Sequence, residues 1–339
     1  MKKLTPHENN NAIMKSITPA MSYNESIPFD VWQKKSKEKL AELLGMDKFQ
    51  KCDMEFNVEY KKELENATEI RFTFQSEEGY YIPCHLLIPK GADKKLPVVI
   101  CLQGHSTGMH ISLGRKKFSI DEELISGGDR DFANRIVEEG YIALAMEQRN
   151  FGECGGKEDG NTNCYNSSMA AILIGRTTIG ERVWDISRVI DVLETKFADV
   201  YNGYCICMGN SGGGTAAFYA SCLEDRINAS MPSCAVCSFE HSIGAKRHCS
   251  CNFIPHIREY FDMGDIGGLI APKKCVVVSG ATDWGFPLEG SLKSAQTIKE
   301  LYKIAGCEDS FRHVIGSEGH RFYADDAWPV MNELIKDEI

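Results

Sequence analysis

Residues 204–221 read YCICMGNSGGGTAAFYAS, and they are the most informative part of the chain. An apolar run ends at Met208, a glycine-rich turn carries Ser211, and a run of small residues typical of a helix start follows. Gly209, Ser211 and Gly213 match the pattern G-x-S-x-G, in which the serine occupies a sharp turn between a strand and a helix. Glycine is needed on both sides because a side chain there would collide with the neighbouring strand or helix. We therefore predict that Ser211 projects above the end of a buried strand.

Two other structures could use the same glycines, namely a plain turn and a phosphate-binding loop. The stretch contains neither G-x-G-x-x-G nor a G-K-[ST] ending, which are the glycine patterns of nucleotide-binding loops. The strand pattern before the turn and the helix pattern after it both favour the serine turn.

Further short apolar runs occur after Pro97, and stretches with helical spacing separate them. These runs are VVICL at 98–102, YIALAM at 141–146, INASM at 227–231 and CVVVSG at 275–280. Such runs are typical of parallel strands that are buried on both faces. Before Pro97, apolar and polar residues alternate over 56–60 and 70–74, and the run at 80–89 follows a turn, which predicts antiparallel strands at one edge.

The order of strands and helices predicts an α/β protein with a doubly wound, mostly parallel sheet and an antiparallel N-terminal part. In such sheets ligands bind at the carboxyl ends of the strands. We expect residues 1–50 to form an N-terminal helical arm, in which a helix over Asp30 to Leu44 ends at Gly45. Residues 51–339 would then form the catalytic domain. Within it, residues 238–268 interrupt the alternation of strands and helices, and we expect them to form a pocket over the serine turn.

Charge and composition exclude several kinds of partner. The 339 residues carry 48 acidic against 38 basic side chains, a net charge of −10 that disfavours nucleic acids and anionic lipids. No stretch approaches the roughly 18 apolar residues of a membrane span, and no apolar run follows the positive N-terminus. We therefore expect a cytoplasmic protein that contacts neither nucleic acid nor membrane, and whose 14 cysteines are reduced thiols.

A serine hydroxyl is a weak nucleophile at neutral pH, so a base must take its proton and an acid must orient that base. In this architecture the order along the chain is serine, acid, histidine. Asp283 follows the run CVVVSG, and His320 follows the run FRHVIG, so both side chains would lie at the carboxyl ends of strands. They are the predicted acid and base. The rival acids are Glu240, Asp262, Asp265 and Glu318, and the rival base is His313.

Hydrolysis of an ester passes through an oxyanion that needs two backbone N–H donors. One donor is expected to be Gly212, the residue after the nucleophile. The loop after VVICL reads QGHSTG, and by position His105 would provide the second donor, with Ser106 as the alternative. A glycine-rich turn with a purely structural role remains a further alternative for this loop.

Two cysteine patterns raise the question of metal binding or redox chemistry. Cys249 and Cys251 lie beside His248 and near His256, but their spacing matches neither paired C-x-x-C units nor H-E-x-x-H. The C-x-x-C at 234–237 follows a late strand and does not open a thioredoxin unit. We therefore expect no metal, no redox role and no cofactor.

Residues 147–152, EQRNFG, also follow a strand and carry charged groups. We expect those groups to pair and to stabilise the loop below the site rather than to touch substrate.

Three motifs together resemble the α/β-hydrolase superfamily, and within it the acetyl xylan esterase and dienelactone hydrolase-like branch. They are GNSGGG at 209–214, ATDWGFP at 281–287 and EGHRFYADDAW at 318–328. Residues 248–274 also resemble a stretch of uncharacterised esterases of that branch, and the resemblance extends from about Asp30 onward.

This resemblance implies the α/β-hydrolase fold, with Ser211 as nucleophile, His320 as base and Asp283 as the acid that orients it. The chain departs from the family pattern at two positions. Gln103 stands where the family's oxyanion loop often begins with histidine, and Gly212 stands where carbohydrate acetyl esterases of the branch often carry glutamine. The second departure argues against acetylated xylan as the substrate.

The sequence therefore predicts a metal-independent serine hydrolase that removes acetyl or another short acyl group from a small ester through an acyl-enzyme intermediate. A lactonase or a peptidase would use the same three residues and would differ only in its pocket. A binding protein that has kept the fold and lost turnover is the third possibility. The small-molecule ester is the expected partner, and the acidic, partly apolar surface permits a homo-oligomer.

Overall fold

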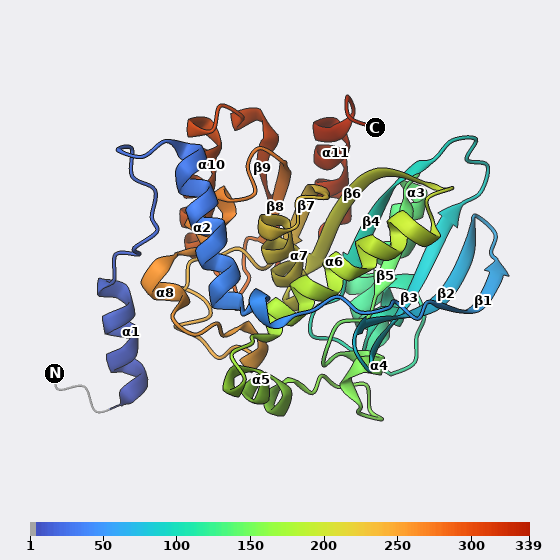
Figure 1. The fold of residues 1–339 in the computed structure, drawn as a ribbon, viewed down its shortest axis with the longest axis horizontal. Coiled ribbons are helices and arrows are strands. Elements are labelled where there is room, and N and C mark those ends of the chain that lie inside the picture. The colour runs from blue at the N-terminus through green and yellow to red at the C-terminus, as the bar shows by residue number, and fades with distance from the viewer. Residues whose placement is uncertain (1–4) are drawn as a thin grey trace.

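A computed structural model describes residues 5–339 of the chain. Its described residues form one sheet with the strand order β1-β2-β3-β5-β4-β6-β7-β8-β9 (Figure 1). The strands are β1 (Asn57–Glu63), β2 (Ala67–Glu77), β3 (Tyr80–Pro89), β4 (Leu96–Leu102), β5 (Ile142–Met146), β6 (Tyr201–Asn210), β7 (Ile227–Ser233), β8 (Lys274–Gly280) and β9 (Phe311–Gly316). Each predicted apolar run coincides with a strand, because fully buried strands need apolar side chains on both faces.

The pairing of the strands matches the predicted mixed sheet. β1, β2, β3 and β5 pair antiparallel in turn, whereas the pairs from β5 and β4 across to β9 are parallel. β4 lies between β5 and β6, so the chain leaves β4 towards one side of the sheet and later returns to its other side. Such a reversal opens a crevice at the carboxyl ends of the strands. The loop after β4 and the turn after β6 meet at this crevice.

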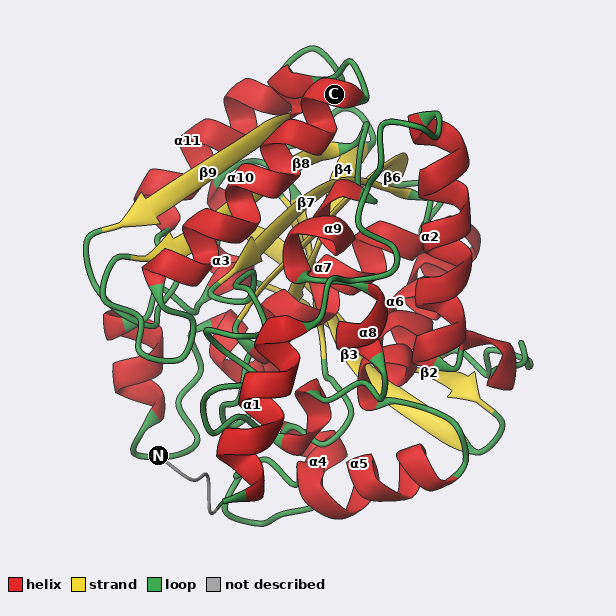
Figure 2. Ribbon diagram, turned by 90° about the vertical axis from the view of Figure 1, so that its left-hand side faces the viewer, coloured by secondary structure: helices red, strands yellow, loops and turns green. Residues whose placement is uncertain are grey.

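Helices cover both faces of the sheet. They are α1 (Pro6–Ser16), α2 (Phe29–Leu44), α3 (Phe132–Glu138), α4 (Gly152–Gly155), α5 (Cys164–Leu173), α6 (Thr178–Lys196), α7 (Gly212–Leu223), α8 (Ile257–Tyr260), α9 (Met263–Gly268), α10 (Leu288–Ile304) and α11 (Ala324–Ile335). Side chains of α2, α6, α7 and α10 share one apolar core, and those of α3 and α11 form a second core on the opposite face. α9 packs against α10 and α7 (Figure 2). None of the helices in residues 5–339 is long and apolar enough to cross a membrane.

The N-terminal segment is built as predicted around α2. Gly45 ends the helix in the left-handed conformation, with φ of 75°, and Leu40 and Leu44 are fully buried. The segment also contacts the insertion between β7 and β8, because the backbone N–H groups of Ala20 and Met21 donate to residues of the 257–260 helix. The arm therefore braces the insertion from outside.

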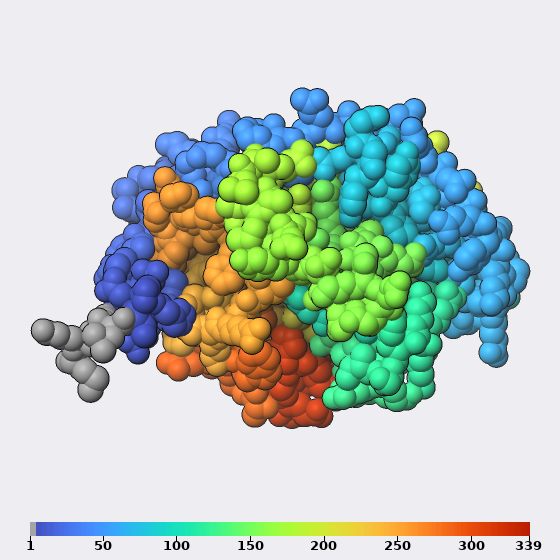
Figure 3. Space-filling model, turned by 90° about the horizontal axis from the view of Figure 1, so that it is seen from below, coloured from blue at the N-terminus to red at the C-terminus, as the bar shows by residue number. Residues whose placement is uncertain are grey.

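Residues 238–268 contain α8, α9 and irregular chain, and they connect β7 to β8. Figure 3 looks onto the face where this insertion and the segment around α5 lie side by side. Sequence analysis placed no helix at α5. The large apolar residues of this segment, Tyr165, Leu173 and Ile174, are 64–87% exposed, so they form no buried stripe that would predict a helix.

Candidate active site

Ser211 occupies a strained turn between β6 and α7. Its backbone has φ of 57° and ψ of −122°, a left-handed conformation that a non-glycine residue rarely adopts. A Cβ atom on Gly213 would lie 2.1 Å from the carbonyl oxygen of Leu102, and one on Gly209 would lie 2.5 Å from the backbone of Gly213. The two glycines are needed because β4 and the first turn of α7 approach so closely. The serine turn predicted from the sequence is therefore present.

Asp283 and His320 are joined by a hydrogen bond. Asp283 lies in the turn after β8, and His320 lies in the loop after β9, at the same end of the sheet as Ser211. Nδ1 of His320 donates to Oδ2 of Asp283 over 2.7 Å. The other carboxylate oxygen accepts the backbone N–H groups of Gly285 and Phe286 at 2.8 and 3.0 Å. These contacts orient the imidazole through Nδ1, and within residues 5–339 its Nε2 makes no hydrogen bond.

The electrostatics of Asp283 favour an ionised carboxylate. Its burial alone would raise the pKa, but the hydrogen bond and charge of His320, together with the two backbone donors, lower the pKa below its usual value. Phe286 stacks on His320 with parallel rings 5.9 Å apart. The acid and the stacked ring therefore both fix the orientation of His320.

The end of β7 and the residue after it lie between this pair and the serine turn. The N–H of Ser211 donates to the carbonyl of Ser233 over 2.8 Å. The next residue, Cys234, places its thiol within 4.8 Å of the side-chain donor atoms of Asp283 and His320. Ser211 is only partly buried, and its hydroxyl makes no hydrogen bond with a residue of the described chain.

The rival acids and the rival base have other contacts. Asp262 and Asp265 form the N-terminal capping box of α9. Glu240 pairs with Lys293, and Glu318 pairs with Arg321 over 3.2 Å. The remaining rival, His313, lies inside β9, where its Nε2 contacts Ser279 Oγ over 3.0 Å and burial lowers its pKa to about 4.

The loop after β4 lies directly against the nucleophile. A Cβ atom on Gly104 would lie 2.8 Å from Cβ of Ser211. The imidazole of the next residue, His105, packs against Gly212, where an added Cβ would meet Nδ1 at 3.0 Å. Within residues 5–339 neither the N–H of His105 nor that of Gly212 donates to another group. Both predicted oxyanion donors are therefore unpaired beside Ser211.

Of the charged groups in the loop at 147–152, Arg149 forms the ion pairs that were predicted, whereas Glu147 does not. Arg149 makes bidentate contacts of 2.7 and 2.8 Å with Asp185 and a further ion pair with Glu77. Glu147 instead accepts the backbone N–H groups of Met109 and Glu153 at 3.1 and 3.2 Å. Glu147 is buried, and within residues 5–339 no Lys, Arg or His forms an ion pair with it, so burial raises its pKa to about 7.

A cavity of about 800 Å³ opens between α5 and the insertion. Its lining comprises Thr162, Cys164, Tyr165, Met169, Arg247, His248, Cys249, Ser250, Phe253 and Trp284. Ser211 and His320 do not line it, but two of its lining residues adjoin the Asp283–His320 pair. Trp284 follows Asp283, and His248 packs edge-on against Phe286, the ring that stacks on His320.

Sequence analysis missed a cluster of four side chains beside the oxyanion loop. His105, Cys164, Cys249 and Cys251 place one nitrogen and three sulfur atoms within 4.8 Å of one another. The two histidines considered with these cysteines point elsewhere. His248 contacts the carbonyl of Gly285, whereas His256 is exposed and pairs with Glu259.

The C-x-x-C cysteines are both free thiols. Cys234 donates to the carbonyl of Arg321 over 3.2 Å, and Cys237 donates to that of Pro287 over 3.5 Å. Burial raises the pKa of each thiol to about 12. The two cysteines therefore do not form a redox pair, and each packs separately beside the site.

Comparison with known proteins assigns the fold that this geometry suggests. The profile of the Abhydrolase family matches residues 8–332, which is nearly the whole chain. The chain belongs to the Abhydrolase family. Its mostly parallel sheet and the sharp turn at Ser211 are those of the α/β-hydrolase fold, so the predicted fold class and family resemblance are confirmed.

This member of the Abhydrolase family has one similar sequence that is named as a hydrolase, and its fold is shared by solved structures of esterases. YtaP of Bacillus subtilis (strain 168), a provisionally named hydrolase, is 26% identical over 247 residues, which span 70% of this chain and 77% of YtaP. A provisionally named acetyl xylan esterase from Bacteroides fragilis NCTC 9343 superimposes with a TM-score of 0.76 at 17% identity, over 93% of this chain and 83% of that one. A glucuronoyl esterase from Solibacter usitatus gives a TM-score of 0.70 at 17% identity, over 95% and 99% of the two chains.

Proposed function

We propose that the protein is a serine esterase that removes acetyl or other short acyl groups, with Ser211, His320 and Asp283 as its catalytic triad. The observation that carries this proposal is the hydrogen bond from His320 to the buried Asp283, at the sheet end where Ser211 sits in its strained turn. This order and placement of the three groups is that of the triad in α/β-hydrolases.

In the first half of the reaction, Ser211 Oγ attacks the ester carbonyl while Nε2 of His320 takes the hydroxyl proton. Asp283 stays ionised, holds the proton on Nδ1 and stabilises the imidazolium that forms. The C–O bond to the alcohol then breaks, and His320 returns its proton to the leaving alkoxide. The products are a free alcohol and an acyl-Ser211 ester.

In the second half, water attacks the acyl-enzyme while His320 again acts as the base, and Ser211 recovers its proton as the acid leaves. In both tetrahedral intermediates the oxyanion accepts hydrogen bonds from the N–H groups of Gly212 and His105. These donors come from the serine turn and from the loop after β4, which Gly104 allows to approach Ser211. Losing one such donor typically costs about 10²–10³ in rate.

The alcohol half of the substrate is assigned to the cavity between α5 and the insertion. Its volume of about 800 Å³ suits a group the size of a sugar or larger. Tyr165 and Trp284 border it with 70% and 69% of their surface exposed, so they offer apolar faces to a ligand. The names of the acetyl xylan and glucuronoyl esterases with the same fold support a carbohydrate ester, although Gly212 argues against acetylated xylan itself.

We also assign the protein to a reducing, cytoplasmic environment. All 14 cysteines are free thiols, and ten of them are buried. Reduced thiols at this number are typical of intracellular proteins.

The experiment combines a fluorophosphonate probe with p-nitrophenyl acetate. We expect the wild type to be labelled and to release a burst of nitrophenol, and Ser211→Ala to do neither. Ser126→Ala, an exposed serine that bonds only to Glu122, is the matched control and should behave as wild type.

Each other outcome would indicate a different function. A wild type without labelling or burst would be a binding protein, and activity that survives in Ser211→Ala would require another nucleophile. Faster turnover of longer acyl esters would contradict the short-acyl assignment. Faster turnover of lactones or peptides would support the alternative members of the same fold.

A further inference from the structure

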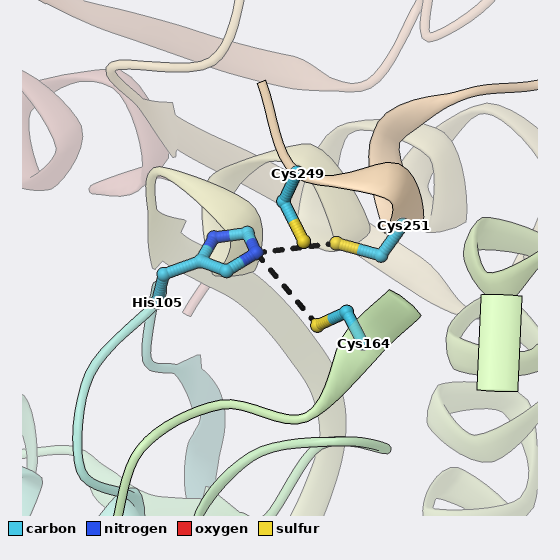
Figure 4. A group of neighbouring side chains, drawn as sticks. All are labelled: His105, Cys164, Cys249 and Cys251. Carbon is cyan, nitrogen blue, oxygen red and sulfur yellow. Dashed lines mark hydrogen bonds between the residues drawn. The ribbon is translucent and has the colours of Figure 1, made fainter. Parts of the chain in front are cut away.

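The cluster of His105, Cys164, Cys249 and Cys251 brings together three segments that are far apart in the sequence. His105 lies in the loop after β4, Cys164 begins α5, and the other two cysteines belong to the insertion. Figure 4 shows the four side chains converging on one point, with the three sulfur atoms facing Nε2 of the imidazole. All four donor atoms lie within 4.8 Å of one another.

The distances within the cluster suit a tetrahedral metal ion. Nε2 of His105 lies 3.2 Å from Sγ of Cys251 and 3.9 Å from Sγ of Cys164. With Zn–S bonds of about 2.3 Å and a Zn–N bond of about 2.0 Å, a tetrahedral zinc ion separates each sulfur from the nitrogen by roughly 3.5 Å. The two observed distances lie on either side of that value. Three cysteines and one histidine are also an established donor set for zinc.

A buried arginine supplies an independent argument. Arg182 is completely buried, and one of its guanidinium nitrogens lies 3.8 Å from Sγ of Cys251. Within residues 5–339 its side chain has no carboxylate partner; its other hydrogen bond goes to the carbonyl of Arg149. A buried cation needs a counter-charge. Zinc with three thiolates and a neutral imidazole carries a net charge of −1, which Arg182 would balance.

The surroundings of the cluster resemble the shell of a closed structural site. Phe151 is completely buried, forms an apolar group with Cys164 and Cys251, and lies with its ring 4.8 Å from that of His105. The guanidinium of Arg182 stacks over the ring of Phe151 at 4.2 Å. On this inner side of the cluster an apolar shell limits the access of water, whereas Cys164 and Cys249 face the cavity.

We propose that His105, Cys164, Cys249 and Cys251 bind one Zn²⁺ ion in a closed tetrahedral site that fixes the oxyanion loop. All four positions are filled by protein, so the ion is structural and takes no substrate. Because Nε2 of His105 would be held by the metal, the opposite edge of its ring stays packed against Gly212. The site also ties α5 to the insertion, because Cys164 begins α5 and Cys249 belongs to the insertion. Both cysteines line the cavity, so the ion would also hold its wall in place.

The metal site itself does not depend on the esterase assignment, whereas the role of the ion in positioning the oxyanion loop rests on that proposed function. The first test is therefore metal content. The full chain, expressed with added zinc and passed through a chelating resin, should contain close to one zinc ion per chain by elemental analysis. A content far below one ion, or a disulfide between any two of the three cysteines by mass spectrometry, would overturn the proposal.

Substitutions locate the ion. Cys164→Ser and Cys251→Ser should each lower the zinc content severalfold, whereas Cys307→Ser should keep it, because that half-buried thiol lies outside the cluster and bonds only to Tyr302. Ser211→Ala should also keep its zinc, which separates failure of the metal site from failure of the esterase assignment. Zinc retained in full by Cys251→Ser would place the ion elsewhere and overturn the proposal.

A spectroscopic test covers the case in which a cysteine variant does not fold. Wild-type protein expressed in medium with cobalt in place of zinc should show the intense visible bands of tetrahedral Co²⁺. It should also show the near-ultraviolet charge-transfer band of cobalt–thiolate bonds. The weak spectrum of octahedral cobalt with oxygen ligands would overturn the proposal.

The positioning role is tested by removing the metal from the wild type. Metal-free protein should lose roughly tenfold or more in kcat for a short-chain ester, with a smaller change in KM, because a displaced oxyanion donor acts in the transition state. Re-addition of Zn²⁺ should restore the rate. An unchanged kcat in protein shown to be free of metal would overturn this positioning role. The metal site itself would still be decided by the zinc content.

Discussion

Nδ1 of His320 donates a 2.7 Å hydrogen bond to Oδ2 of Asp283, a residue only 4% exposed. This contact fixes both the tautomer and the direction of the imidazole, since the proton must sit on Nδ1 when the acceptor is an ionised carboxylate. The remaining nitrogen, Nε2, is then left as an acceptor, as the proposed role of His320 as the base requires.

The first prediction concerns this contact. Asp283→Asn should keep the fold and lower kcat by about 10³–10⁴, because an amide can hold the wrong tautomer of His320. The measurement is the hydrolysis of p-nitrophenyl acetate, with circular dichroism to check the fold. Glu318→Gln, an exposed acid two residues from the histidine, is the control and should stay near the wild-type rate. If kcat fell less in Asp283→Asn than in Glu318→Gln, the assignment of Asp283 as the acid would be wrong.

The second prediction concerns the close approach of β4 and α7. Gly213→Ala should lower the free energy of unfolding by more than about 2 kcal/mol, because the new methyl group would meet the carbonyl of Leu102 at 2.1 Å. Urea denaturation measures the change. Gly127→Ala, where the nearest contact is an ordinary 3.9 Å, should change stability far less. Equal stability of the two variants would show that the strand and helix can separate at no cost.

The third prediction follows from the buried Glu147. Burial raises its pKa from 4.5 to about 7, so between these values the folded protein holds a proton that the unfolded chain has released. Its contribution to stability is therefore complete below about pH 4.5 and is lost as the pH rises through 7. Over that window the loss amounts to at most about 3 kcal/mol.

Glu147→Gln should remove this dependence, so its stability relative to wild type should rise between pH 5 and pH 8. Urea denaturation at both pH values tests it, with the exposed Glu123→Gln as the control. A constant difference between Glu147→Gln and wild type across the two pH values would mean that the carboxyl does not titrate in this range.

The fourth prediction concerns the rim of the cavity. Trp284 is 69% exposed beside Asp283, so Trp284→Ala should leave the triad intact and remove an apolar contact with the alcohol group. We expect KM for 4-methylumbelliferyl acetate to rise roughly fivefold, and that for methyl acetate to stay constant. Ile304→Ala, an exposed apolar residue on α10, is the control. Equal effects on the two esters would place the alcohol group elsewhere.

Much of the candidate site could be predicted because its signals are local. The serine turn is encoded within five consecutive residues, where Gly209 and Gly213 flank Ser211, and the close approach that demands them is a property of every strand–turn–helix of this kind. Asp283 and His320 were found through topology, since each follows an apolar run, and parallel strands end on one side of a sheet.

The cysteine cluster could not be predicted in the same way. Its ligands sit at positions 105, 164, 249 and 251, so only one pair lies close in sequence, and that pair has no recognised metal spacing. α5, which delivers Cys164, was also missed, because its large apolar residues face outward and its buried ones are small.

The amino-acid sequence by itself determined the strand–helix alternation and the serine turn, because periodicity and turn chemistry act over a few neighbouring residues. It also singled out Asp283 and His320 as the candidate acid and base. Only the tertiary structure decided which side chains meet across segments: His105 with three cysteines, and Arg182 with Cys251. Such contacts depend on how the loops after β4, before α5 and after β7 fold over one sheet end. No local pattern records that packing.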